Sequence, residues 1–290
     1  MADESEHRVL ARWRRNVGSP VALDLAPPAP QRIRGLDVLC WNLKVGGARL
    51  DALLGRLREG EFGGAGTDPE RPLVVLAQEA YRADESVPER VVESGAEGGD
   101  LTPPDAEDVV AVARRQGLSL RYAPSMRNGA ARSDRGNAVL CTTAIGHAHG
   151  FALLYLRQRR VAVAAEVHGV PGLTLVSAHL DTHRRPFAGD SDSYVPGGAR
   201  AEQARRLAEA VVRRDGPGGV ILGGDFNTPL GHFDPAYRAL VRAGLTPARR
   251  ARRWLHTHHG PVRFLLDHLL YHSASGHLES VVVTRLDEHP

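Results

Sequence analysis

The chain has 290 residues, enough for one large sandwich or two modest domains. Hydrophobic residues make up 42% and charged residues 24%, as in an ordinary soluble globular protein, and two cysteines are too few for a disulfide framework. The net charge of +3 and the pI of about 9.1 permit a polyanionic partner without demanding one.

The beginning of the chain predicts a short charged helix at 5–16 and a stiff proline-rich linker at 26–30, APPAP, within an N-terminal segment 1–30. The remaining residues, 31–290, are expected to form one domain. The N-terminus has acids and arginines where a secretory signal needs an apolar core, and no apolar stretch approaches the roughly 18 residues of a membrane span. We therefore expect a soluble, cytoplasmic protein with no membrane span. Its oligomeric state cannot be read from the sequence.

Short apolar runs bounded by turn residues predict buried strands. They cover 36–41, 73–77, 137–141, 161–167, 173–178, 219–222, 263–270 and 279–285. Apolar positions spaced by three and four predict helices at 48–58 and 199–214, and a third helix at 105–116 with Asp105 as its N-cap. Long polar loops are expected at 80–104, 125–136 and 182–198. Because 137–178 holds three strands without room for a helix, the α/β fold must be partly antiparallel.

Polar residues of one chemical kind follow several of these strands: Asn42, Glu79, His179, Asp225 with Asn227, and Asp267. Carboxylates and carboxamides are hard oxygen ligands that suit Mg²⁺, Mn²⁺ or Ca²⁺. A histidine among them suits stabilisation of a phosphoryl oxygen. Gly223 and Gly224 allow another group to approach closely. Each element also has an ordinary structural interpretation, such as a solvated edge residue, an Asx turn or a core histidine.

Five strings resemble, in order, successive motifs of the endonuclease/exonuclease/phosphatase family of metal-dependent phosphoester hydrolases. They are WNLK (41–44), QEA (78–80), SAHLD (177–181), GGDFNT (223–228) and LDHLL (266–270), and GNAVL (136–140) is similar to its bacterial members. The resemblance spans 36 to about 285. It implies a four-layer α/β sandwich of two mixed β-sheets flanked by helices, with the active site at one edge of the sheets.

The resemblance also implies roles for the matched residues. Glu79 resembles the principal metal ligand and Asn42 a metal or phosphate contact. Asp225 resembles the residue that orients or deprotonates the attacking water and contributes to the metal site, while Asn227 positions the phosphate. His179 resembles the histidine that stabilises the developing charge. Asp267 resembles the carboxylate that pairs with a second, C-terminal histidine.

Three further residues are candidates for substrate contact: Arg82, Asn137 and His183. Arg82 is equally well interpreted as a solvated arginine, and His183 as a loop residue. The HTHHG string at 256–260 could suggest zinc, but the carboxylates explain the site better. The arginine run 248–254 could grip a nucleic-acid backbone or form a solvated face.

The expected function is hydrolysis of a phosphodiester by water, without a covalent intermediate, with Mg²⁺ as cofactor and Mn²⁺ as a possible substitute. Nucleic acid is the first choice of substrate because of the basic balance, and a small-molecule or phospholipid phosphoester is the alternative. The family's closing Ser-Asp-His motif has no clear match, although Glu288-His289-Pro290 resembles it faintly. We therefore also expect that the usual last strand is missing, which leaves a non-catalytic protein that binds phosphate or nucleic acid as another alternative.

Overall fold

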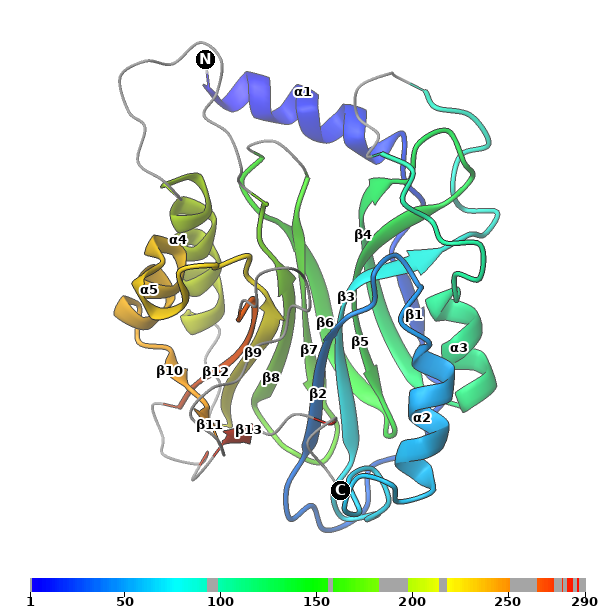
Figure 1. Cartoon of the computed structure of the whole chain (residues 1–290), viewed down its shortest axis with the longest axis vertical. Helices are drawn as coiled ribbons and strands as arrows, with labels where there is room; N and C mark the ends of the chain where they lie inside the picture. Colours follow the sequence, from blue (N-terminus) through cyan, green and yellow to red (C-terminus); the bar gives the residue numbers. More distant parts are fainter. Residues whose placement is uncertain are drawn as a thin grey trace.

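The computed structural model describes residues 2–92, 99–155, 159–182, 198–213, 218–250, 265–273, 278, 281–283 and 286. These residues form two β-sheets that pack face to face, with helices on the outer face of each (Figure 1). None of the helices in this part of the chain is both long and apolar enough to cross a membrane.

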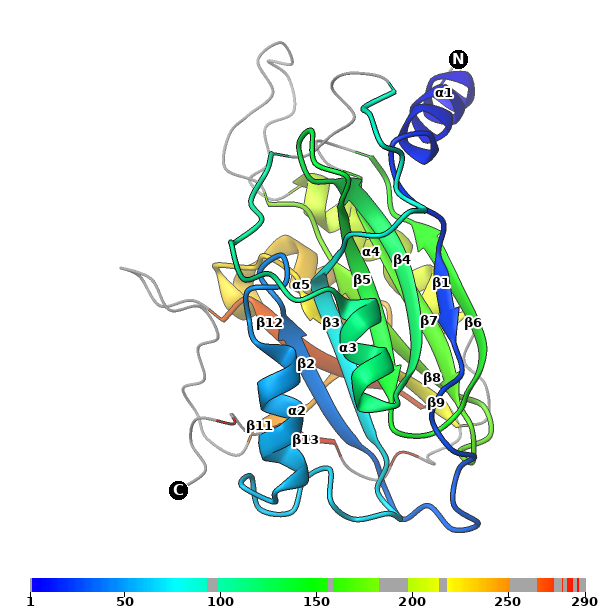
Figure 2. The same cartoon turned by 90° about the vertical axis from the view of Figure 1, so that its right-hand side faces the viewer.

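The first sheet has five strands in the order β1-β4-β5-β3-β2. Their bounds are β1 Val21–Leu23, β2 Asp37–Asn42, β3 Leu73–Arg82, β4 Ser119–Arg127 and β5 Asp134–Cys141. The β2–β3 pair is parallel, while β3, β4 and β5 pair antiparallel. Helices α2 (Leu50–Arg58) and α3 (Val109–Gln116) cover the outer face of this sheet (Figure 2). Leucines of α2 and valines of α3 build the apolar core between them and the sheet.

The second sheet has six strands in the order β10-β12-β9-β8-β7-β6. Their bounds are β6 Ile145–Ala152, β7 Val161–Val167, β8 Leu173–His179, β9 Gly219–Asp225, β10 Thr246–Pro247 and β12 Asp267–His272. Only β8 and β9 pair in parallel; every other neighbouring pair is antiparallel. Helices α4 (Gly198–Val212) and α5 (Pro235–Arg242) pack on its outer face. A short 3₁₀ turn, η1 (Gly231–Phe233), precedes α5, and β11 (Arg249–Arg250) pairs in parallel with β13 (Val282–Val283).

A third apolar core lies between the two sheets and is made of β-branched and leucine side chains from both. Three separate cores therefore divide four layers, which confirms the expected sandwich and its mixed sheets. Cys40 and Cys141 are both free thiols that face this apolar interior.

Several local expectations were wrong or incomplete. Helix α3 begins at Val109, four residues after the expected start, because Asp108 and not Asp105 caps it by accepting from Val110 N and Ala111 N. The polar segments 80–104 and 125–136 are not loops throughout, since β3 continues to 82 while β4 and β5 leave only 128–133 between them. Strands β1, β4 and β6 and helix α5 were not expected.

The N-terminal segment contributes to the first sheet. Helix α1 (Ala2–Arg14) leads to β1, which pairs antiparallel with β4, and Trp13 Nε1 donates to Ser125 O at 2.5 Å. Within the proline-rich stretch, Pro27 O accepts from Ala144 N at 2.9 Å.

Candidate active site

Strand register gathers the expected polar residues at one edge of the sandwich. Asn42 ends β2 opposite Gln78 of β3, so Glu79 follows immediately in the neighbouring strand. His179 and Asp225 end the parallel strands β8 and β9 and are direct partners. Ends of parallel strands meet at the same sheet edge, and the two sheets bring their edges together here.

Glu79 leaves its strand at a β-bulge that interrupts the β3–β5 pairing between Ala77 and Ala80. Its backbone has φ of 50°, a left-handed conformation that is uncommon outside glycine and is found at functional sites. Its neighbour Gln78 is buried and donates to Ser177 Oγ of the second sheet at 3.0 Å. This hydrogen bond links the two facing sheets beside the bulge. The bulge therefore places Glu79 outside the regular β3–β5 pairing.

The Glu79 carboxyl is three-quarters buried and lies in a mixed electrostatic environment. Burial raises its pKa, and the negative charge of Asp225 adds to that rise. The positive charges of Arg160 and Arg135 and a hydrogen bond with Asn42 oppose it. Two carboxylates therefore share one poorly hydrated space.

Asp225 is held by two donors. Asn42 Nδ2 donates to its Oδ2 and the backbone N–H of Asn227 donates to its Oδ1, both at 3.0 Å. The glycines before it permit close packing of strands: a Cβ at Gly224 would lie 1.9 Å from Ala178 O, and one at Gly223 would lie 2.7 Å from Leu76 Cδ1. The close approach that these two glycines allow is therefore made by neighbouring residues of the protein, Ala178 and Leu76.

His179 lies in the middle of the cluster, with 3% of its surface exposed. Its Nδ1 is 3.9 Å from Glu79 Oε1, and its Nε2 is 3.8 Å from Asp225 Oδ2. Burial, followed by the charges of Arg160 and Arg135, holds the pKa of His179 well below its usual value, so the ring is neutral at physiological pH.

Asn227 approaches the same ring. Its Nδ2 lies 3.0 Å from His179 Nε2 and donates to Leu180 O at 2.9 Å. Like Glu79, it has φ of 50°, a conformation that asparagine tolerates better than most residues.

Two arginines belong to the cluster although the sequence did not single them out. Arg160 precedes β7 and Arg135 lies in β5; each has 5% of its surface exposed, and burial lowers the pKa of both guanidiniums. Arg160 Nη1 contacts His179 Nδ1 at 3.0 Å. Arginine is so frequent in this chain that neither position is distinctive in the sequence. The sequence feature that could have identified Arg160 is its place directly before β7, the strand that pairs with the strand of His179.

Asp267 begins β12 and pairs with Asp225 in the antiparallel ladder. The C-terminal histidine that pairs with this carboxylate in the family has no clear match in the sequence, and His289, which resembles it faintly, lies outside the described residues. The adjacent His268 points to the opposite face, as the alternation of a strand requires. It stacks on Phe226 with ring centroids 5.8 Å apart and contacts Thr228 Oγ1 through Nε2 at 2.7 Å.

Two of the three further candidates, Arg82 and Asn137, are buried and make hydrogen bonds within the fold. Arg82 is fully buried, not solvated, and its Nε donates to Asp134 Oδ1 at 3.0 Å while Nη1 donates to Ser19 O at 2.6 Å. Asn137 is also buried and donates to Val161 O at 2.7 Å. His183 lies outside the described residues, as does the HTHHG string.

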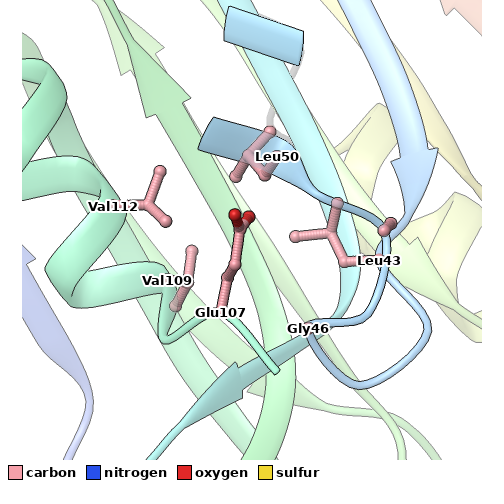
Figure 3. A pocket seen from close by; sticks show the side chains of 7 residues that line it. Leu43, Gly46, Leu50, Glu107, Val109 and Val112 are labelled. Atoms are coloured by element: carbon pink, nitrogen blue, oxygen red, sulfur yellow. The ribbon is translucent and has the colours of Figure 1, made fainter. Parts of the chain in front are cut away.

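A small hollow on the outer side of the first sheet is a packing feature. Figure 3 shows its lining between the loop after β2 and the start of α3. It admits essentially no water, and its one carboxylate, Glu107, accepts from Asp51 N at 3.1 Å.

The sequence profile of the Endonuclease/Exonuclease/phosphatase family matches residues 39–288. The chain therefore belongs to that family, as its motifs indicated. A comparison with curated protein sequences gave no match.

Two solved structures illustrate the similarity of fold. A family protein from Leptotrichia buccalis has a TM-score of 0.51 and 15% identity, covering 81% of this chain and 86% of that one. A family protein from Beutenbergia cavernae has a TM-score of 0.51 and 16% identity, covering 82% of this chain and 64% of that one. At such low identity the likeness establishes the fold alone.

Proposed function

We propose that this protein hydrolyses phosphodiesters with the help of a divalent cation, Mg²⁺ or Mn²⁺, and that nucleic acid is its substrate class. The observation that carries this proposal is the convergence of Glu79, Asp225 and His179 from both sheets, with His179 within 4 Å of each carboxylate. Neutral histidine, paired carboxylates and carboxamides at one edge suit attack by water on a phosphorus centre.

The donor set fits a hard cation. Glu79 and Asp225 supply carboxylate oxygens and Asn42 an amide oxygen, one lone pair of which accepts from Lys44 N at 2.9 Å. Within the described ranges, no group of three or more His, Cys, Asp and Glu side chains is arranged to hold a metal ion. Mg²⁺ is commonly held by one or two carboxylates together with several waters, so the proposal assigns it to Glu79 and Asp225 with Asn42.

A bound Mg²⁺ would supply Lewis-acid stabilisation of charge on the phosphoryl oxygens. The chain's own residues would do the rest. Asp225, held at both oxygens by Asn42 and Asn227, would orient the attacking water and accept its proton. His179 and Asn227 would donate to a phosphoryl oxygen.

The test is hydrolysis of plasmid, single-stranded DNA and bis-p-nitrophenyl phosphate with Mg²⁺, with Mn²⁺ and with excess chelator. The proposal expects turnover that needs the metal and that Glu79→Gln abolishes. Hydrolysis only of the small ester would support the small-molecule or phospholipid alternative. Salt-sensitive binding of DNA without hydrolysis of any substrate would contradict the catalytic proposal and favour a phosphate-binding protein.

A further inference from the structure

Arg160 and His179 make a buried contact that the proposed chemistry does not yet use. Arg160 Nη1 lies 3.0 Å from His179 Nδ1, and the two residues are 5% and 3% exposed. The charged groups around this pair are Asp181, Glu79, Asp225 and Arg135.

A guanidinium can only donate hydrogen bonds, and it stays protonated in proteins. Nδ1 of His179 must therefore accept from Arg160. A neutral imidazole that accepts at Nδ1 carries its single proton on Nε2.

A second donor lies on the other side of the ring. Asn227 Nδ2 donates to Leu180 O at 2.9 Å, which identifies that atom as the amide nitrogen, and it also lies 3.0 Å from His179 Nε2. His179 can accept from only one of its two neighbours. The Arg160 bond prevails because it is charge-assisted and buried. The Nε2–H and the Asn227 amide are then two donors side by side, which suits one shared acceptor such as a phosphoryl oxygen.

The backbone around Arg160 is fixed at three successive carbonyls. Ser125 Oγ donates to Arg159 O, Leu153 N donates to Arg160 O at 2.8 Å, and Asn137 Nδ2 donates to Val161 O at 2.7 Å. Asn137, a candidate for substrate contact, thus supports the segment that carries Arg160. Such support is what holds a side chain to the accuracy that a catalytic site needs.

We propose that Arg160 is a positioning residue that fixes the Nε2–H tautomer of His179 and so aims that proton, together with the Asn227 amide, at a phosphoryl oxygen of the substrate. The catalytic part of this inference rests on the proposed hydrolysis. The tautomer does not, since it belongs to the protein without substrate.

The tautomer can be read directly from long-range ¹H–¹⁵N spectra of protein labelled at histidine, with the His179 signals assigned by their loss in His179→Gln. Four proteins are compared: wild type, Arg160→Lys, which keeps a charged donor, Arg160→Met, which removes it, and Arg159→Met. Arg159 is the matched control, because it is the adjacent buried arginine but its guanidinium lies over Trp13, 5.6 Å from the ring centroid. Thermal unfolding of each variant checks that it is folded.

Wild type and Arg159→Met are expected to show a bare Nδ1 and a protonated Nε2, and Arg160→Lys to retain this pattern. In Arg160→Met the proton moves to Nδ1, because Asn227 becomes the sole donor and Nε2 must accept. With bis-p-nitrophenyl phosphate, kcat in Arg160→Met falls about 100-fold while KM stays within about threefold, and Arg160→Lys recovers part of the loss.

A protonated Nδ1 in wild type, or the same tautomer in wild type and Arg160→Met, would overturn the inference. Absence of metal-dependent hydrolysis by wild type would instead overturn the proposed function and, with it, the catalytic use of the tautomer. The spectra alone would then decide whether Arg160 determines the tautomer of His179.

Discussion

Asp225 lies directly opposite Asp267 in the antiparallel β9–β12 ladder, so two acidic side chains from adjacent strands reach the same edge of the sheet. The two carboxylates also act on Cys40 of the facing sheet. Burial raises the pKa of its thiol well above the usual value, and the negative charges of Asp267 and Asp225 raise that pKa further. The edge where the two sheets meet is therefore strongly acidic, with Arg160 and Arg135 as the nearby counter-charges of Glu79.

Glu79→Gln is expected to stabilise the metal-free protein while it removes activity. Burial and the charge of Asp225 raise the pKa of Glu79, so the folded state disfavours its carboxylate, and this penalty is present above the unfolded-state pKa of about 4.5. Removing the charge should add on the order of 1 kcal/mol or less to the free energy of unfolding near pH 7, as is usual at strained functional sites. Urea unfolding in chelator measures this.

The same variant tests metal binding without reference to turnover. Mg²⁺ should raise the unfolding midpoint of wild type by preferential binding to the folded state, and Glu79→Gln should lose most of that response. Asp105→Asn is a suitable control, because Asp105 is an exposed carboxylate paired with Arg49. An equal Mg²⁺ response in Glu79→Gln and wild type would rule out Glu79 as a metal ligand.

Asp225→Asn is expected to lower kcat by about 10³-fold with little change in KM, because the substitution preserves shape but removes the base and one negative charge. The side chain's two accepted hydrogen bonds, from Asn42 and from the Asn227 backbone, can be only partly retained, so a modest loss of stability should accompany it. Steady-state kinetics on bis-p-nitrophenyl phosphate decide the matter: a raised KM with unchanged kcat would assign Asp225 to binding alone.

The strands of this fold that could be predicted are those with an uninterrupted apolar face, such as 73–77 and 161–167. They are buried on both sides, so almost every position is apolar. Strand β6, IGHAHGFA, lies at the edge of the second sheet with one side in water, and its glycines and histidines conceal the pattern. Strand β4 carries arginines and a proline in sequence yet is almost wholly buried, because tertiary contacts override local preference.

The residues of the candidate site likewise include some that could be predicted from the sequence and some that could not. Carboxylates and amides at strand ends could be predicted, because each follows a recognisable strand and a family motif. Arg160 could not, because its contribution depends on the pairing of β7 with β8 and on contacts that Ser125 and Asn137, on distant strands, make with the carbonyls beside it. Arg82 is the opposite case. Its position three residues after Glu79 suggests a substrate contact, but its guanidinium is buried and bonded to Asp134 of the same sheet.

His268→Gln is expected to reduce the acid sensitivity of the fold. Burial, followed by the charge of Arg250, lowers the pKa of His268 from 6.5 to about 3. The unfolded chain therefore takes up this proton near pH 6.5 and the folded chain only near 3, so stability is fully present above that window and is lost as the pH falls through it. Each pH unit inside the window costs up to about 1.4 kcal/mol.

Glutamine does not titrate and can still contact Thr228, so the unfolding midpoint of His268→Gln should fall less steeply than that of wild type between pH 6.5 and 4. Thermal unfolding at a series of pH values measures the slope. His147→Gln, at an exposed position on β6, is the control and should follow wild type. Parallel slopes for wild type and His268→Gln would mean that His268 is not a buried neutral group.

Arg82→Met is expected to destabilise the fold and to leave substrate affinity unchanged. Asp134 would remain buried with its charge uncompensated, although it still accepts from Gly18 N at 2.8 Å and from Tyr122 Oη at 2.7 Å. Breaking a buried ion pair from one side costs about 3–5 kcal/mol. The double variant Arg82→Met/Asp134→Asn removes both charges; its amide oxygen can still accept from Gly18 N and its amide N–H can donate to Tyr122 Oη, so it should recover part of the loss. Urea unfolding of wild type, Arg82→Met, Asp134→Asn and the double variant gives the coupling energy, and KM for bis-p-nitrophenyl phosphate gives the affinity. A several-fold rise in KM with unchanged stability would make Arg82 a phosphate contact after all.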